Sequence, residues 1–204
     1  MPKGQARRWR SLVLTGGPGG GKSSLRAPLA AALEDHADHV LVAPEAARLV
    51  IETGFPVTEA TREPLQRAIM ELQVQLRCSL TALAAELPGK VVVIFDRAEP
   101  DGSAYLPPEA YLRLLAGLGL TPTKAREQYD VVLHLQTAAA GAEQDYALDA
   151  ARAEDAAAAR ALDVALLAAW AGHPARVVVP TAPTFDEKVE RVVVAATEAL
   201  SRSH

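Results

Sequence analysis

Several residue types are scarce in this chain of 204 residues, and each scarcity excludes a class of protein. Cys78 is the only cysteine, so an internal disulfide and a cysteine-based zinc site are both excluded. Aromatic residues make up 4% of the chain, which leaves few side chains on which the bases of a single-stranded nucleic acid could stack. Alanine and leucine supply most of the apolar side chains, and both favour helices.

An excess of one charge is also lacking. The formal net charge is −4 and there is no long basic stretch, so we do not expect nucleic acid as a partner. No apolar run approaches the roughly 20 residues of a membrane span, and the polar N-terminus does not look like a signal peptide. We therefore expect a cytoplasmic protein that does not enter the membrane; no feature of the sequence indicates its oligomeric state. The length and the 50% hydrophobic content fit a single α/β domain over residues 1–204.

The chain is organised around Ser11–Ser24, SLVLTGGPGGGKSS, where an apolar run meets a glycine-rich turn and a Lys-Ser pair. Its residues fill the fixed positions of the P-loop, G-x-x-x-x-G-K-[ST]. The glycines let backbone N–H groups approach phosphate oxygens, the lysine reaches the β- and γ-phosphates, and the serine hydroxyl can ligate Mg²⁺. The sequence thus predicts a site for ATP, with GTP as the alternative, and for Mg²⁺. The residues expected to bind them are Gly17, Pro18, Gly19, Gly20, Gly21, Lys22, Ser23 and Ser24.

The glycine-rich turn has two other interpretations. The first is a turn that only links a strand to a helix, which leaves the complete motif unexplained. The second is a Rossmann dinucleotide loop, because Gly17 and Gly19 could begin G-x-G-x-x-G and Glu45 lies at a suitable separation for a ribose contact. Lys22 occupies the position of the third glycine, so we favour the P-loop.

Apolar runs and helical periodicities alternate along the chain, a pattern typical of α/β proteins with a parallel sheet. We expect strands at 11–15, 39–43, 90–95, 130–135 and 175–179. Helices are expected at 22–33, at 65–87 after Pro64, at 111–118, at about 151–171 and in a final segment whose Phe185 is predicted to face the core. The long helix carries a stripe predicted to face the core, formed by Leu65, Ile69, Leu72, Leu76, Leu80, Leu83 and Leu87.

Acidic residues follow two of the predicted strands. The run Lys90–Phe95 ends in Asp96, and an apolar strand that delivers a carboxylate is the Walker B pattern, so Asp96 is expected to help Ser23 hold Mg²⁺. The alternative is an Asp that only caps a turn. Pro44 ends the second strand and places Glu45 at its carboxyl edge, where ligands bind in open parallel sheets.

Two further segments carry residues with a possible role at the site. Residues 138–160 are small and polar without a strand period and predict a lid, from which Arg152 would reach the phosphates. Arg160, eight residues further on, would lie near the same helix face. His134 lies in the middle of a predicted strand and is interpreted as a packed core histidine.

The chain resembles the small AAA-type P-loop ATPase and kinase family that includes nicotinamide riboside kinase domains of the NadR type. The resemblance rests on TGGPGGGKSS, on PEAAR after the second strand, on FDRAEPDGSAY after the third and on AARAED in the lid, and it covers most of the chain in order. It departs from the family at Ala98, where glycine is common.

The resemblance implies a P-loop NTPase three-layer sandwich with a five-strand parallel sheet of order 2-3-1-4-5 and a helical lid. It further implies a kinase-like site in which Glu45 and the pair Asp96-Arg97 meet the acceptor.

From these observations we expect ATP-dependent transfer of the γ-phosphoryl group to a hydroxyl of a small molecule. Glu45 and Asp96 are the candidate bases, Arg97 and Arg152 would offset phosphoryl charge, and Asp101 would position the acceptor or brace Arg97. Two alternatives stay open: a nucleotide-binding switch or slow NTPase with a protein or lipid partner, and a polynucleotide 5′-kinase.

Overall fold

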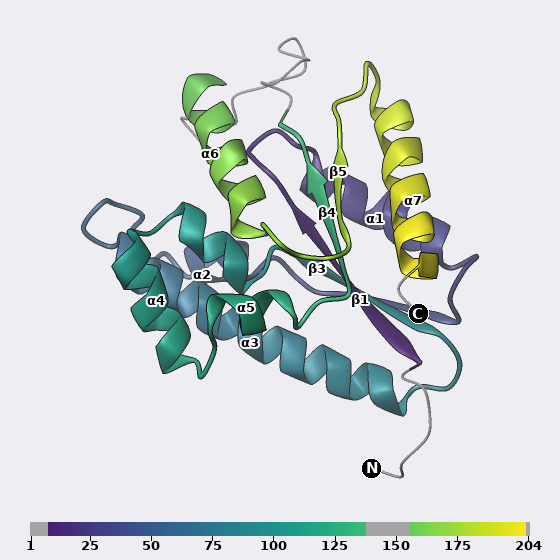
Figure 1. Cartoon of the computed structure of the whole chain (residues 1–204), viewed down its shortest axis with the longest axis horizontal. Coiled ribbons are helices and arrows are strands. Elements are labelled where there is room, and N and C mark those ends of the chain that lie inside the picture. Colours follow the sequence, from purple (N-terminus) through teal and green to yellow (C-terminus); the bar gives the residue numbers. More distant parts are fainter. Residues whose placement is uncertain (1–7, 138–155, 203–204) are drawn as a thin grey trace.

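The computed structural model describes residues 8–137 and 156–202, which alternate between strands and helices (Figure 1). The elements in chain order are β1 (Trp9–Thr15), α1 (Lys22–Leu33), β2 (His39–Val42), α2 (Ala46–Glu52), α3 (Arg62–Glu86), β3 (Val91–Asp96), the 3₁₀ helix η1 (Glu99–Ala104), α4 (Pro108–Gly117), α5 (Pro122–Arg126), β4 (Val131–Leu135), α6 (Ala156–Ala169), β5 (Arg176–Val179) and α7 (Phe185–Arg202).

The strands form one parallel sheet of order β2-β3-β1-β4-β5, which confirms the expected fold class and strand order. The register pairs Leu14 of β1 with Asp96 of β3, and Thr15 with His134 of β4. Because all carboxyl ends lie at one edge, Asp96 is placed beside the strand that leads into the glycine-rich loop.

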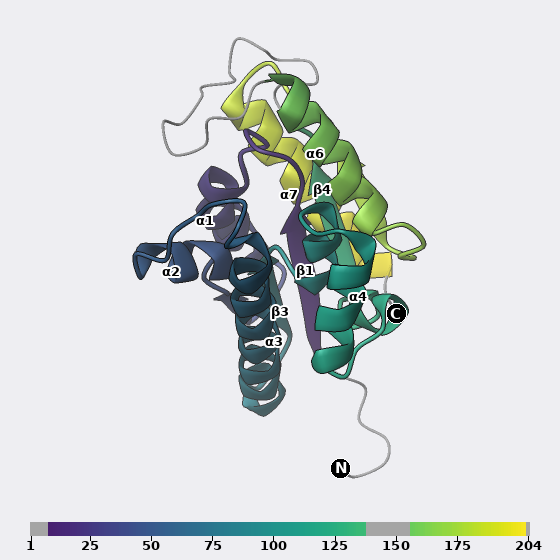
Figure 2. The same cartoon turned by 90° about the vertical axis from the view of Figure 1, so that its left-hand side faces the viewer.

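Helices cover both faces of the sheet (Figure 2). On one face, α1 and α7 pack on the even-numbered residues of β1, with Leu12 and Leu14 fully buried. On the other face, Val13 packs with residues of β3 and with Trp170, which follows α6. All six residues of β3 are buried, as expected for a central strand covered on both sides.

The structure differs from the prediction in several helices and in the leucine stripe of α3. Short helices α2, η1 and α5 were not predicted, and α3 begins at Arg62, two residues before Pro64, because proline is tolerated in the first turn of a helix. The leucine stripe of α3 is only partly correct: Leu83 is 55% exposed. Phe185, at the start of α7, is exposed as well.

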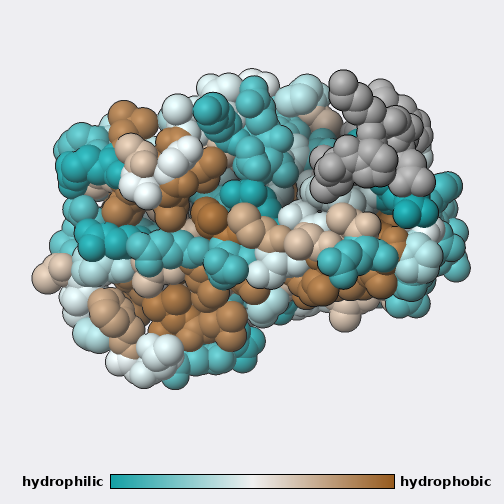
Figure 3. Space-filling view, turned by 90° about the horizontal axis from the view of Figure 1, so that it is seen from below, coloured by the Kyte–Doolittle hydropathy of each residue, from teal (hydrophilic) through white to brown (hydrophobic). Residues whose placement is uncertain are grey.

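The surface mixes polar and apolar side chains, and in the view of Figure 3 apolar patches lie beside rows of polar ones. Among the described helices, none combines the length and the apolarity that crossing a membrane requires.

Candidate functional site

The loop between β1 and α1 has the backbone form that its glycines predict. Gly16, Gly19 and Gly21 have φ of 126°, 70° and 80°, a region that other residues rarely adopt. A Cβ on Gly16 would lie 2.0 Å from the carbonyl oxygen of Leu135, so only glycine lets the loop pass the end of β4. The first glycine of the motif is therefore required by packing as well as by backbone conformation.

Lys22 is held inside this loop. Its Nζ donates to the carbonyl oxygens of Gly16 and Gly17, each at 2.7 Å, and the residue is 6% exposed. The lysine side chain thus lies across the loop, with its ammonium group at the place where a phosphate is expected to bind. Ser23 and Ser24 follow in the first turn of α1 and are exposed, and Ser23 reaches the cavity described below.

Asp96 lies at the end of β3 and is 3% exposed. Neither carboxyl oxygen accepts a hydrogen bond within the described part of the chain, although Arg26 Nε lies 3.4 Å from Oδ2. Burial raises the pKa of Asp96, and the charge of Glu45 raises it further, while Lys22 and arginines nearby oppose the shift. A buried carboxylate that accepts no hydrogen bond from the described residues, close to the loop lysine, fits a cation ligand better than a turn cap.

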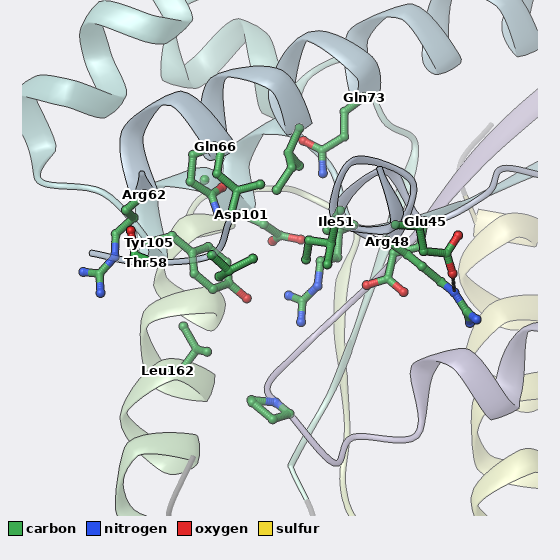
Figure 4. Close-up of a pocket in the computed structure, with 18 of the residues that line it drawn as sticks. Glu45, Arg48, Ile51, Thr58, Arg62, Gln66, Gln73, Asp101, Tyr105 and Leu162 are labelled. Atoms are coloured by element: carbon green, nitrogen blue, oxygen red, sulfur yellow. Dashed lines mark hydrogen bonds and ion pairs between the residues drawn. The ribbon is translucent and has the colours of Figure 1, made fainter. Parts of the chain in front are cut away.

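A cavity of about 940 Å³ opens between the P-loop and the helices on one side of the sheet. Its walls come from the P-loop, α2, residues 57–66, α3, η1 and α6 (Figure 4). Side chains of both charges line it. The residues that line it include Pro18, Ser23, Glu45, Gln73, Arg97, Asp101, Tyr105 and Leu162.

Two of the predicted acceptor residues enter this cavity directly. Glu45 precedes α2 at the end of β2 and is half-buried. Arg97 has a φ of 66°, which turns the chain sharply after Asp96, and its guanidinium lies 5.9 Å from the centre of the Tyr105 ring. Arg97 Nη1 is buried and has no hydrogen-bond partner among the described residues. Ala98, the departure from the family pattern, has an extended φ of −156° that alanine adopts freely.

Asp101 also lines the cavity, but its carboxylate is already engaged. Oδ1 accepts hydrogen bonds from Thr15 Oγ1 at 2.8 Å and from Trp170 Nε1 at 2.7 Å. Burial raises the pKa of Asp101, while Arg97 and these donors lower it. Because its carboxylate is already bonded, Asp101 is better suited to bracing Arg97 than to contacting an acceptor directly.

Part of the prediction falls on residues that are not described. Arg152 and most of the proposed lid, 138–155, lie outside the described residues. Residues 156–160 begin α6, where Arg160 is exposed.

Sequence reasoning missed Gln73 and Asp163. Gln73 lies on the buried face of α3 and is 7% exposed, and its Oε1 accepts no hydrogen bond from the described residues. Gln73 lies in a helix whose apolar stripe is formed by leucines, so the sequence alone predicts that this glutamine is on the exposed face. Asp163 pairs with His134, whose Nε2 lies 3.1 Å from Oδ1, so His134 is buried as expected but has an acidic neighbour.

Comparison with known proteins agrees with this geometry. A family model described as an AAA domain matches residues 11–188, from the P-loop strand to the first turn of α7. No curated protein matches the chain. The match supports the AAA part of the predicted resemblance, whereas the likeness to nicotinamide riboside kinase domains stays a prediction. Since the match covers most of the chain, the chain belongs to the family of AAA domains, P-loop NTPases that bind nucleotides.

Proposed function

We propose that this protein is a phosphotransferase that moves the γ-phosphoryl group of ATP to a hydroxyl of a small molecule. The observation that carries the proposal is the cavity of about 940 Å³ beside the P-loop, because Ser23, Glu45 and Arg97 all face it. Its volume lies in the range of sites that hold small molecules. A kinase needs such a second chamber next to the phosphates, whereas hydrolysis alone needs only water.

The residues of the P-loop would bind the nucleotide. Lys22 and the backbone N–H groups of the loop would neutralise charge on the transferring group, and Arg97, whose Nη1 is unpaired among the described residues, would add a second cation. Arg152 remains a predicted third cation.

Magnesium would be held by Ser23 and Asp96. A hydroxyl and a buried carboxylate supply the oxygen ligands that Mg²⁺ prefers, and phosphate and water oxygens commonly complete its shell. When bound, the ion would neutralise charge on the phosphates.

The two candidate bases have different surroundings. Glu45 lines the cavity, whereas Asp96 lies deeper, close to Lys22 and Arg26. This difference favours Glu45 as the group that accepts the hydroxyl proton and Asp96 as the metal ligand.

The other candidate functions place different demands on the site. A polynucleotide kinase needs a basic groove, but acidic and basic side chains alternate along the cavity wall, among them the pairs Arg48–Glu52 and Arg62–Glu59. A switch or slow NTPase would bind the nucleotide equally well without an acceptor, so only an assay of acceptor dependence separates it from a kinase.

The test is to incubate the protein with ATP, Mg²⁺ and a panel of nucleosides, sugars and polynucleotide 5′-ends, and to measure ADP release. We expect release that depends on one small-molecule acceptor and is lost in Glu45→Gln. Slow release that no acceptor accelerates would contradict the kinase proposal and favour a switch, and acceleration only by polynucleotide ends would favour an end kinase.

A further inference from the structure

A carboxylate on α6 joins three elements at the rear of the P-loop. Asp163, which is 8% exposed, accepts the backbone N–H of Gly17 at Oδ1 over 2.6 Å. The same oxygen lies 3.1 Å from Nε2 of His134 in β4. Burial alone would raise the pKa of Asp163, but these contacts outweigh it and lower the pKa, so the side chain is ionised at neutral pH. The loop, the helix and the strand therefore meet at one carboxyl oxygen.

The packing at Gly17 leaves no room for a Cβ unless Asp163 shifts. A Cβ there would lie 2.9 Å from Cβ of Asp163 and 3.3 Å from the carbonyl oxygen of Ala159. Position 17 is a variable position of the P-loop motif, so the motif does not require its glycine. The close approach of α6 explains why residue 17 is a glycine. The N–H of Gly17 is directed to Asp163 instead of to a phosphate.

Both polar groups of Gly17 are thereby fixed. Its N–H is bound by Asp163, and its carbonyl oxygen accepts from Nζ of Lys22 at 2.7 Å. A single residue thus connects a carboxylate on α6 to the lysine of the P-loop. Moving or deleting that carboxylate would release the segment of backbone against which the lysine is held.

We propose that Asp163 is a positioning residue, which keeps the P-loop in its phosphate-binding form by anchoring Gly17 to α6. The proposal rests on nucleotide binding by the P-loop and names a residue that the motif does not include. It acts through Gly17 and Lys22 and does not touch the nucleotide.

A second hydrogen bond near the same helix provides a matched comparison. Trp170, seven residues after Asp163, donates from Nε1 to Asp101 Oδ1 at 2.7 Å. This bond is also buried, but it ends on Asp101 of η1, whose link toward the P-loop is to Thr15 at the end of β1 and not to Gly17. Trp170→Phe removes it and keeps most of the ring, so the variant reports on general loosening of the fold. Val164, 67% exposed on α6, supplies a surface control as Val164→Ala.

The experiment measures the dissociation constant of ATP with Mg²⁺ by titration calorimetry, on variants whose folding is checked by circular dichroism. We expect Asp163→Ala to weaken binding at least tenfold. Asp163→Asn should stay within about threefold of the wild type, because its Oδ1 can still accept from Gly17. Trp170→Phe and Val164→Ala should stay within about twofold.

A folded Asp163→Ala protein with wild-type affinity would overturn the proposal, as would an equal loss in Trp170→Phe. If Asp163→Ala does not fold, Asp163→Glu takes its place, since it keeps the charge but adds a methylene where space is lacking, and wild-type affinity in that variant would also overturn the proposal. Failure of the wild-type protein to bind ATP would refute the proposed function as well, so the two failures are distinguishable.

Discussion

At the scale of single residues, the proposed chemistry depends on a few side chains. Some of them can be predicted from the sequence, and others are recognised only from their contacts in the folded chain. Lys22 could be predicted because the P-loop fixes its neighbours and spacing. Asp96 could be predicted because it ends an apolar run. Gln73 could not, because its only signal is a side-chain oxygen that has no hydrogen-bond partner among the residues described in the folded protein. The sequence supplies identity and order, while hydrogen-bond partners appear only after folding.

Replacing Lys22 by alanine should lower nucleotide turnover by about 10²–10³-fold, because a cation that stabilises the transferring phosphoryl group is lost. Turnover is measured as ADP release, and folding by circular dichroism. Lys90→Ala, at an exposed lysine before β3, is the control and should keep full turnover. Unchanged turnover in Lys22→Ala would count against the assigned role.

Replacing Asp96 by asparagine should remove activity and stabilise the folded chain at pH 7. The pKa of Asp96 is raised by burial and by Glu45, so folding makes ionisation of this carboxyl less favourable than it is in the unfolded chain. Such a group contributes stability at acid pH that is lost as the pH rises through the folded pKa.

Thermal unfolding of wild type and Asp96→Asn over a pH series tests this. The variant should melt at a higher temperature at pH 7, and the difference should shrink as the pH falls toward the ordinary carboxyl value of about 3.9. A lower melting temperature for the variant at pH 7 would show that attraction to Arg26 outweighs burial.

Replacing Gln73 by leucine should raise the free energy of unfolding by about 1 kcal/mol, because apolar atoms of similar size replace a buried amide oxygen that has no partner in the described part of the chain. Acceptor-dependent turnover should fall, because Gln73 lines the cavity proposed to hold the acceptor, while ATP affinity stays unchanged. Urea unfolding measures the stability, and Gln75→Leu on the exposed face of α3 is the control. A destabilised Gln73→Leu would contradict this.

At the scale of elements, the site is held by contacts between helices that lie far apart in the sequence. Arg77 of α3 donates from Nε to Glu99 of η1 at 3.1 Å, and the hydroxyl of Tyr129 donates to the same carboxylate at 2.7 Å. Glu99 is fully buried. This network fixes η1, and with it the turn that carries Arg97 and Asp101.

Replacing Arg77 by methionine should therefore destabilise the chain by about 3–5 kcal/mol, because a buried carboxylate loses its ion pair. The double variant Arg77→Met with Glu99→Leu should recover part of this loss, since no buried charge is left unpaired. Urea unfolding of the wild type and the variants gives the values. Equal stability of Arg77→Met and wild type would show that the pair contributes little.

The helices and strands also show which elements the periodicity of apolar residues can predict. The five strands and the longer helices were predicted because their apolar patterns extend over several residues. Helices α2 and α5 were not, because five to seven residues provide too few repeats of a helical period. Arg77 and Gln73 share the buried face of α3, so a rule that looks only for apolar spacing misplaces that face.

At the scale of the whole molecule, sheet topology gathers the site. The strand order could be expected from the resemblance, and it brings the P-loop, Asp96 and Glu45 to one edge. The cavity could not be predicted, because its walls come from α2, α3, η1 and α6, and their separations depend on packing that no local pattern encodes.

The most direct test of the central claim, that this edge of the sheet binds a nucleotide, is the melting temperature with and without ATP and Mg²⁺. At a concentration of about 100 times the dissociation constant, binding adds about 2.7 kcal/mol. For a chain of this size the melting temperature should rise by roughly 5–10 °C, and Lys22→Ala should lose most of that rise. A melting temperature unmoved by millimolar ATP or GTP with magnesium would contradict the account.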